Sequence, residues 1–464
     1  MVNTNDIVII GCGAGGATAA QFAKKTDRKA KVTIFESSPF PQYSKCGIPY
    51  AISGEIPKIM DLIEFSEEWF QKARIDLFLN TTVTEIDSEK KIITAKKKDG
   101  NILKKQYTSL IIATGANPSL PPIKNIFKDD SKTLKKNIFT VRTIPDAKKI
   151  SAAAQTGKKA TVVGAGLIGL EMADTLTKKG LKVTIVEALP TILTNILDED
   201  MSKPILGTIK ESAKVHLNTF ATEIKTNSEG KLETVIIKEK DKEEQQEIPT
   251  DLLIIAAGIR PETTLAEQAG CNIGSTKAIV VNELSCTSKP DIYAVGDCTE
   301  YKEFVTESPV PIGLGSIAVR QGIDAGVNAA GGSYSLPKGV LQTATSEFFS
   351  TEIGSVGPSA QTRENLETVS AKYKGLTKPE YFPGGKPITM KTIVDVKTGK
   401  VIGAQAVGEN AAQRVNTYAT AILSELHIDT FKKLETAYAP PIAPTLDVVT
   451  LAADIASIKW HRKK

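Results

Sequence analysis

The chain has 464 residues, of which 41% are hydrophobic and 24% are charged, and its net charge is +5. A chain of this length and composition is expected to fold into about two to four globular domains, which excludes a fibrous or disordered protein. The small basic excess, 58 basic against 53 acidic residues, argues against a nucleic-acid partner. The longest apolar runs, such as residues 252–257, are shorter than the roughly 20 residues that span a bilayer, so no membrane segment is expected.

The sequence gives little support for disulfides or bound metals. Its five cysteines, at positions 12, 46, 271, 286 and 298, are an odd number without C-x-x-C spacing, so neither a disulfide framework nor a zinc site is expected. The three histidines are scattered, and no metal site is predicted. The N-terminal stretch MVNTNDIVIIG has neither a basic region nor an apolar segment of signal-peptide length, so the predicted compartment is the cytoplasm.

A dinucleotide-binding motif lies near the start of the chain. Gly11, Gly13 and Gly16 form the pattern G-x-G-x-x-G directly after the strand-like run DIVII, and Glu36 closes the next strand-like run, 25 residues after Gly11. In such a βαβ unit the first glycine allows a tight turn, the second lets the backbone approach a pyrophosphate, and the third lets helix and strand pack closely. The helix start attracts negative charge, and the acid accepts hydrogen bonds from ribose hydroxyls. The motif predicts a first nucleotide site.

A second copy of the motif follows after residue 160. Gly164, Gly166 and Gly169 repeat the spacing, and Glu187 lies 23 residues beyond Gly164 at the end of KVTIVE, which resembles KVTIFE of the first copy. An acid at this place binds a free 2′-hydroxyl and repels a 2′-phosphate, and no arginine follows it within ALPTILTN. The second site is therefore expected to prefer NADH, with NADPH possible.

The segments around the two motifs suggest how the domains are connected. The strand-like runs SLIIA and LLIIAA each end at a glycine, in ATGANP and AAGIRP, and these segments are expected to cross between domains. PDIYAVGDC predicts a buried strand that ends at Asp297, and GSIAVRQGIDAGVNAAGG has alanine and glycine at helix-packing spacing. The run KEKDKEEQQE (238–247) alternates in sign and predicts a solvated hairpin tip. After about residue 334 the pattern changes to a mixed strand and helix module.

Together these motifs resemble the pyridine nucleotide-disulfide oxidoreductase family. The resemblance depends on the two fingerprints, ATG at 113–115, AAGIRP at 256–261 and YAVGDC at 293–298, and it covers essentially the whole chain. It implies that the first fingerprint binds FAD, the second binds NAD(P)H, and Asp297 contacts the ribityl chain of the flavin. The implied fold is α/β, with two Rossmann-like dinucleotide-binding domains and a C-terminal α+β dimerisation domain. The implied bounds are 1–118 with 262–333 for FAD, 119–261 for NAD(P)H and 334–464 for dimerisation.

Cys46 is the candidate redox centre. Most of the family carry a C-x4-C pair, but the residues five positions away here are Pro41 and Ala51, which excludes a two-cysteine mechanism. The run YSKCGIPY resembles the single-cysteine branch of the family, which includes coenzyme A disulfide reductases, NADH-dependent polysulfide reductases, NADH oxidases and NADH peroxidases. Lys45 and a helix that begins near Cys46 are expected to lower the pKa of its thiol and favour the reactive thiolate. The other four cysteines are interpreted as buried and inert.

Two further features bear on the choice within this branch. Family oxidases and peroxidases that form a sulfenic acid usually carry a histidine in the first glycine turn, where this chain has Ala14, so peroxidase and water-forming oxidase chemistry are disfavoured. The segments PEYFPGGKP and AYAPPIAPTLD resemble the coenzyme A disulfide and sulfur reductases, and this resemblance assigns a catalytic role to Tyr381 and Tyr438. A phenol can protonate a departing thiolate. In the family these tyrosines reach the cysteine of the other subunit, which implies a homodimer with shared active sites.

Several positions depart from this branch. Gln42 stands where many members have serine, and Lys24 and Lys25 match only part of the basic set that some members use for coenzyme A phosphates. The sulfur substrate, whether a coenzyme A disulfide, a polysulfide or another small disulfide, therefore stays open. We expect NADH to reduce FAD, which then reduces a mixed disulfide or persulfide on Cys46. Two alternatives stay open: an NADH oxidase that makes peroxide without Cys46, and a flavin-based redox sensor.

Overall fold

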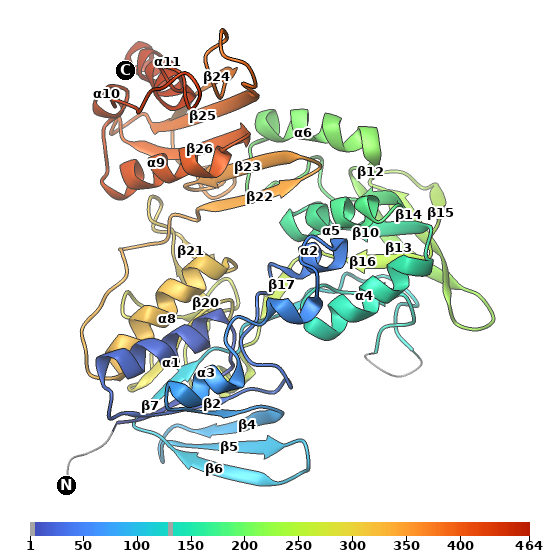
Figure 1. The fold of residues 1–464 in the computed structure, drawn as a ribbon, viewed down its shortest axis with the longest axis vertical. Coiled ribbons are helices and arrows are strands. Elements are labelled where there is room, and N and C mark those ends of the chain that lie inside the picture. Colours follow the sequence, from blue (N-terminus) through green and yellow to red (C-terminus); the bar gives the residue numbers. More distant parts are fainter. Residues whose placement is uncertain (1–4, 129–132) are drawn as a thin grey trace.

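The computed structural model describes residues 5–128 and 133–464, which form three lobes (Figure 1). Two lobes each contain a parallel sheet that carries one of the glycine motifs, and the third lobe is the C-terminal module. Residues 1–4, part of the stretch from which the cytoplasm is predicted, lie outside the described residues. In the described part of the chain, no helix is both long and apolar enough to cross a membrane.

The first lobe is built on a parallel sheet with strand order β19-β7-β1-β2-β3. Its central strands are buried on both faces, as expected for runs such as DIVII that consist almost wholly of branched apolar residues. The strands are β1 (Asp6–Ile10), β2 (Lys31–Phe35), β3 (Ile75–Phe78), β7 (Ser109–Ile112) and β19 (Ile292–Ala294).

Helices α1 (Ala14–Thr26) and α8 (Gly315–Ala329) lie side by side in this lobe (Figure 1). Their backbones approach closely because α8 presents glycine at the contact: a Cβ at Gly322 would overlap the carbonyl oxygen of Gly15, and one at Gly326 would overlap that of Ala19. The helix-packing spacing predicted after residue 314 is therefore confirmed.

The second lobe repeats the arrangement with strand order β12-β11-β10-β16-β9, also parallel. The register of β10 against β11 matches that of β1 against β2, residue for residue along five pairs. The strands are β9 (Ile138–Phe139), β10 (Lys159–Val163), β11 (Lys182–Val186), β12 (Lys214–His216) and β16 (Leu252–Ile255), and the helices are α4 (Ile144–Thr156), α5 (Leu167–Lys178) and α6 (Glu199–Ser212).

The predicted crossings between domains pair with each other: β8 (Ala116–Pro118) and β17 (Ile259–Pro261) form an antiparallel ribbon. Each of the two lobes also carries an antiparallel three-stranded sheet. These are β4 (Thr81–Asp87), β5 (Ile92–Lys97) and β6 (Ile102–Gln106) in the first lobe, and β13 (Thr219–Thr226), β14 (Leu232–Glu239) and β15 (Gln245–Pro249) in the second. The charged run 238–247 forms the exposed tip between β14 and β15, as predicted.

The C-terminal module consists of a five-stranded antiparallel sheet, in the order β22-β23-β26-β25-β24, with helices packed against it (Figure 1). Its main core surrounds the fully buried Tyr418 and Met390, whereas Phe348 and Ile353 of β22 and β23 belong to the core of the second lobe. The elements are β22 (Ala344–Phe348), β23 (Thr351–Val356), β24 (Thr368–Leu376), β25 (Pro387–Asp395), β26 (Val401–Gly408), α9 (Ala411–Leu423), α10 (Ile428–Phe431) and α11 (Val448–Lys463).

Short elements complete the first lobe and its connections. They are α2 (Ile48–Ser53), the 3-10 helix η1 (Ile59–Leu62), α3 (Glu67–Lys72), α7 (Thr264–Gln268), β18 (Ile279–Val280), β20 (Thr299–Lys302) and β21 (Pro309–Pro311). Although α2 lies between β2 and β3 of the first lobe in sequence, it packs against α4 and α5 of the second lobe. The segment that begins at Cys46 therefore bridges the two lobes.

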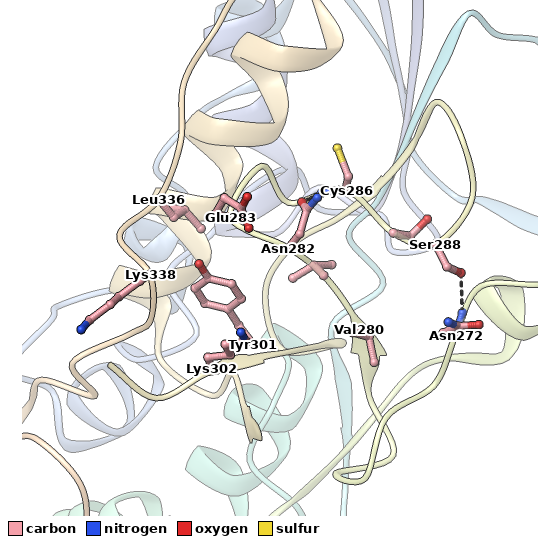
Figure 2. Close-up of a pocket in the computed structure, with 12 residues that line it drawn as sticks. Asn272, Val280, Asn282, Glu283, Cys286, Ser288, Tyr301, Lys302, Leu336 and Lys338 are labelled. Carbon is pink, nitrogen blue, oxygen red and sulfur yellow. Dashed lines mark hydrogen bonds between the residues drawn. The ribbon is translucent and has the colours of Figure 1, made fainter. Parts of the chain in front are cut away.

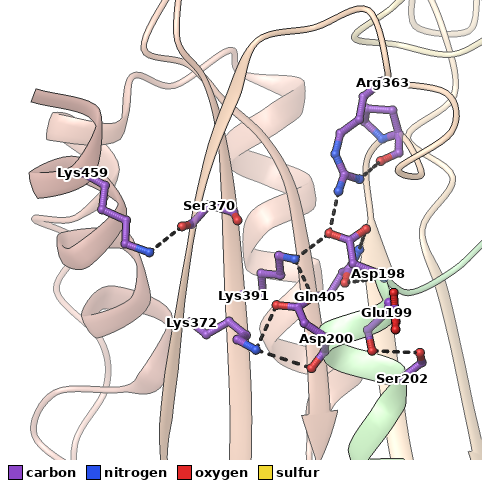
Figure 3. A network of polar contacts seen from close by, with 11 residues as sticks. Asp198, Glu199, Asp200, Ser202, Arg363, Ser370, Lys372, Lys391, Gln405 and Lys459 are labelled. Atoms are coloured by element: carbon purple, nitrogen blue, oxygen red, sulfur yellow. Dashed lines mark hydrogen bonds and ion pairs between the residues drawn. The ribbon is translucent and has the colours of Figure 1, made fainter. Parts of the chain in front are cut away.

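A buried ionic network joins α6 to the sheet of the C-terminal module (Figure 3). Asp198, at the start of α6, accepts ion-pair contacts from Arg363 at 2.5 Å and from Lys391 at 2.6 Å. Lys391 also contacts Asp200 at 2.7 Å, and the amide of Gln405 donates to Asp198 at 3.0 Å. The network satisfies charges that lie at the contact between the second lobe and the module. It therefore fixes how these two parts sit against each other.

We expect Asp198→Asn to lower the stability of the chain at neutral pH. Burial tends to raise the pKa of Asp198, but its hydrogen bonds and charge contacts with Arg363 and Lys391 outweigh burial and lower that pKa to about 2. Since the folded-state pKa is below the unfolded one, the stabilisation is present above about pH 4 and is lost as the pH falls toward 2, and it amounts to roughly 2 kcal/mol. Thermal unfolding at several pH values checks this: the deficit of the variant should shrink in acid. An equal deficit in exposed Asp61→Asn would contradict it.

Candidate active site

The two glycine turns have the same backbone geometry. Gly11 and Gly164 adopt φ of +101° and +102°, a region that residues with a side chain rarely enter. A Cβ at Gly16 would overlap the carbonyl oxygen of Gly11, and one at Gly169 would overlap that of Gly164. In both turns the first glycine is required by the backbone and the third by the close approach of helix to strand.

The middle glycines have a different role. Gly13 and Gly166 have ordinary φ values of −72° and −79°, and a Cβ built on either would meet no protein atom within 4 Å. The protein's own packing therefore does not require glycine there. Both residues cap helices, α1 and α5, whose first turns contain no acidic residue. This combination of open space and a positive helix end suits the pyrophosphate of a dinucleotide, so the residues present fit the two predicted cofactors.

The two predicted acids are held at these turns in equivalent ways. Glu36 accepts a hydrogen bond from the amide of Cys12 at 2.7 Å, and Glu187 accepts one from the amide of Ala165 at 2.6 Å. The second oxygen of each carboxylate accepts, at 2.8 Å, from the amide two residues further on, that of Ser38 or Leu189. Each carboxylate is therefore fixed beside its glycine turn, where it would meet the ribose of a nucleotide bound at the helix start.

Asp297 lies beyond the end of β19 and forms an ion pair with Arg142 at 2.7 Å. Both side chains are largely buried, and Nε of Arg142 is buried without a hydrogen-bond partner. Arg142 comes directly before Thr143, which caps α4 in a reciprocal capping box with Asp146. Sequence reasoning did not identify Arg142. The available signal was an arginine placed just ahead of a capping box where the chain enters the second lobe.

Cys46 lies just before α2, whose capping residue is Gly47 and whose first turn contains Pro49. All five cysteines are free, and Cys46 is the exposed one: Cys286 is half-buried, and the other three, Cys12, Cys271 and Cys298, are buried. The predicted helix next to Cys46 is therefore present, and the candidate thiol is the one that solvent reaches most easily.

The expected fall in the pKa of the Cys46 thiol is wrong for this structure. Although the residue is exposed, neighbouring protein atoms partly desolvate the thiol, and this raises its pKa. The negative charges of Glu171 and Asp297 raise it further, whereas Arg142 and Lys45 lower it. Desolvation and the nearby charge of Arg142 also lower the pKa of Lys45.

Glu171 is a second charged residue that sequence reasoning missed. It lies in α5, two residues after the third glycine, and its Oε1 accepts a hydrogen bond at 2.6 Å from Ser346 of β22. Burial raises the pKa of its carboxyl. The equivalent residue in the first motif is Thr18, so a comparison of the two copies would have revealed a carboxylate in place of a neutral residue.

The structure brings together Tyr381 and Tyr438, 57 residues apart in sequence, with a hydroxyl-to-hydroxyl distance of 2.7 Å. Both are exposed, at 72% and 47% of their surface. Tyr381 lies between β24 and β25 and Tyr438 between α10 and α11, all elements of the C-terminal module, whereas α2 packs against α4 and α5 of the second lobe. Within one chain, the tyrosine pair and the Cys46 segment therefore belong to different parts of the molecule.

A cavity of about 640 Å³ lies in the first lobe, with Cys286, Tyr301 and Lys338 on its wall (Figure 2). It contains none of the predicted site residues. The hydroxyl of Tyr301 donates to the carbonyl of Pro337 at 2.7 Å, and Lys338 forms an ion pair with Glu425, so both polar groups have partners within the protein. Among residues 5–128 and 133–464, no cluster of three or more histidine, cysteine or acidic side chains could hold a metal ion.

Two dinucleotide sites of this kind, with an exposed cysteine between them, define an oxidoreductase that pairs a flavin with a nicotinamide. The chain belongs to the pyridine nucleotide-disulphide oxidoreductase family: the family model matches residues 5–322, and the model of its dimerisation domain matches residues 343–449. This family uses FAD and NAD(P)H, so the predicted cofactors are confirmed. The predicted α/β fold with a C-terminal dimerisation domain is also confirmed.

The similarity to related proteins extends over nearly the whole length of the chain. A protein of Methanocaldococcus jannaschii named NADH oxidase is 37% identical over 98% of this chain and 99% of its own length. A protein of Pyrococcus abyssi named NAD(P)H sulfur oxidoreductase (CoA-dependent) is 34% identical over 97% of both chains. The solved structure of a NAD-dependent persulfide reductase from A. fulgidus superposes with a TM-score of 0.92 and 32% identity, over 98% of this chain and 84% of that one.

Proposed function

We propose that this enzyme reduces the sulfur–sulfur bond of a small disulfide, a polysulfide or a coenzyme A disulfide through Cys46. The observation that carries the proposal is that Cys46 is the exposed cysteine and lies beside α2, which bridges the two nucleotide-binding lobes. The sulfur and persulfide reductases among the relatives support the substrate class. The name of the P. abyssi relative includes CoA, which supports a coenzyme A disulfide as one candidate.

The roles of the other site residues follow from the same proposal. Residues 1–118 and 262–333 bind FAD through Gly11, Gly13, Gly16, Glu36 and Asp297. Residues 119–261 bind NADH through Gly164, Gly166, Gly169 and Glu187, and residues 334–464 form the dimerisation domain. The equivalent geometry of the two turns supports both nucleotide assignments. When bound, FAD supplies two-electron transfer from the nicotinamide to sulfur.

The reaction at Cys46 takes place in two halves. The Cys46 thiolate attacks one sulfur of the substrate, which forms a mixed disulfide and releases the other sulfur as a thiolate that takes up a proton. Two electrons and a second proton then cleave the mixed disulfide, which regenerates the Cys46 thiolate and releases a second thiol. Tyr438 of the partner subunit, with Tyr381 of the partner subunit beside it, is suited to protonate the leaving sulfur.

The partner that we propose is a second copy of this chain. The segment between α10 and α11 exposes four large apolar side chains, and exposed apolar side chains gathered in one segment mark a protein contact. The same segment contains Tyr438, so a contact there would bring the tyrosine pair to the partner. We place the homodimer in the cytoplasm, since five free cysteines suit a reducing compartment. The exposed residues are Leu434, Tyr438, Ile442 and Leu446.

A second candidate, an NADH oxidase that makes peroxide, is favoured by the name of the M. jannaschii relative. The two functions differ in their acceptor and in their need for Cys46. Anaerobic turnover of NADH with a coenzyme A disulfide, a polysulfide or a small disulfide, each with and without added coenzyme A, tests the proposal. Rapid NADH consumption with one of these acceptors supports it. Turnover that occurs only with oxygen would overturn it.

We expect Glu187→Ala to raise the efficiency of NADPH relative to NADH by roughly tenfold or more, because the variant lacks the charge that repels a 2′-phosphate. Steady-state kcat/KM with each nucleotide measures the change, and Glu229→Ala on the exposed β13–β14 turn serves as the matched control. An unchanged or lower NADPH to NADH ratio in the Glu187 variant would reject this assignment.

A further inference from the structure

Three parts of the chain meet at Glu171. The residue belongs to α5 of the second lobe, and its hydrogen bond from Ser346 comes from the first strand of the C-terminal module. Ser346 also acts on the pKa of Tyr50, on the helix that follows Cys46. One turn further along α5, Thr175 donates to the carbonyl of Pro49 at 3.2 Å and holds the two helices together. Glu171 is therefore anchored beside the Cys46 segment from two directions.

Charges of both signs act on Cys46, and they come from different elements. Glu171 on α5 and Asp297 after β19 disfavour the thiolate, whereas Arg142 before α4 and Lys45 favour it. Asp297 and Arg142 form an ion pair with each other, so their effects on the thiol largely oppose one another. Within the described part of the chain, Glu171 forms no ion pair and is held by a neutral hydroxyl, that of Ser346. It is therefore the charge whose removal would change the field at Cys46 most.

We infer that Glu171 is a positioning residue that sets the pH at which Cys46 becomes a nucleophilic thiolate, and that Ser346 holds it for this role. The inference rests on the proposed function, in which Cys46 attacks the substrate. An ionised Glu171 repels the thiolate, and a protonated Glu171 does not. The two groups therefore compete for protons, and the C-terminal module takes part because it supplies Ser346.

The surroundings of Glu171 support this role. Burial raises the pKa of its carboxyl, and the hydrogen bond from Ser346 lowers it in part. Tyr50 stays neutral, since burial and the nearby Glu171 charge raise its pKa to about 12. Glu347 lies next to Ser346 but is exposed. Among the other charged groups near α5 and α2, Lys178 contacts both Asp174 and Glu55, and Lys179 lies beside Gly54 at the far end of α2.

The test follows alkylation of Cys46 by iodoacetamide in the FAD-loaded protein as a function of pH, with peptide mass spectrometry to identify the site. Only the thiolate reacts, so the midpoint of the profile reports the pKa of Cys46. We expect Glu171→Gln to lower that midpoint by about one pH unit, which makes alkylation roughly tenfold faster below the wild-type midpoint. An unchanged or higher midpoint in the folded, FAD-loaded variant would overturn the inference.

Three further variants keep the test decisive. Glu171→Asp retains the charge and should keep the midpoint close to wild type. Ser346→Ala removes the hydrogen bond, so Glu171 binds a proton more readily, and the midpoint should fall by less than in Glu171→Gln. Glu347→Gln removes an exposed charge next to Ser346 and should leave the midpoint of the alkylation profile unchanged. A midpoint shift as large as that of Glu171→Gln would overturn the inference. Alkylation needs no substrate, so turnover of Cys46→Ser tests the proposed function separately.

Discussion

Replacement of Cys46 by serine is expected to abolish sulfur reduction, with a loss of at least about a thousandfold in kcat, because a serine hydroxyl can neither attack a disulfide nor form a mixed disulfide. The same variant should still bind both nucleotides, since Gly13, Gly166 and the acids are unchanged. Anaerobic mixing with NADH should therefore bleach the flavin at close to the wild-type rate. The measurement is stopped-flow absorbance followed by steady-state turnover with a disulfide acceptor.

The matched control is Cys286→Ser, because Cys286 is the other cysteine that solvent reaches in part. Its loss should leave turnover within about twofold of wild type. Full activity of Cys46→Ser with disulfides would defeat the proposed mechanism. It would favour the oxidase reading, in which electrons leave the flavin without passing through a thiol.

The second large effect is a recovery of activity in mixed dimers. Cys46→Ser subunits and Tyr381→Phe, Tyr438→Phe subunits should each be strongly impaired as homodimers. A heterodimer of the two should have one complete site if each site combines Cys46 of one chain with the tyrosines of the other, so its activity should approach half that of wild type. The tyrosine pair lies in the C-terminal module, whereas the Cys46 segment of the same chain packs against the second lobe, which is the geometric reason for this expectation.

Differently tagged subunits allow the heterodimer to be purified after exchange, and the two parent homodimers serve as controls. If each site drew all three residues from a single chain, each site of the heterodimer would lack at least one of them. Purified heterodimers that stay inactive, despite full FAD content, would therefore exclude shared sites.

The sequence predicts the structure correctly where the backbone conformation depends on residues that are close together in the chain. Each glycine turn and its acid lie on consecutive strands of one βαβ unit, so the pattern around Gly11 and Gly164 predicts the backbone that the structure has. The same holds for the helix that follows Cys46, because its capping residue Gly47 and the early Pro49 lie one and three residues after Cys46. These features need no knowledge of how distant segments pack.

Residues joined by tertiary contacts could not be found in this way. Arg142 and Asp297 are 155 positions apart, and Glu171 and Ser346 are 175 apart, so no local pattern links them. This also explains the wrong expectation for the pKa of Cys46. The sequence showed the neighbouring Lys45, but it did not show the desolvation of the thiol, which raises its pKa most, or the carboxylates of Glu171 and Asp297, which come from distant segments and raise it further.

Trapping the mixed disulfide shows whether electrons reach sulfur through Cys46. Enzyme with a free Cys46 thiol and an oxidised flavin is mixed anaerobically with a disulfide substrate, separated from excess substrate, quenched in acid, and analysed by intact mass and peptide mapping. We expect a mixed disulfide on the peptide that contains Cys46, close to one per subunit, which disappears when NADH is added before the quench. Continued turnover with no adduct on Cys46, or with the adduct on another cysteine, would contradict it.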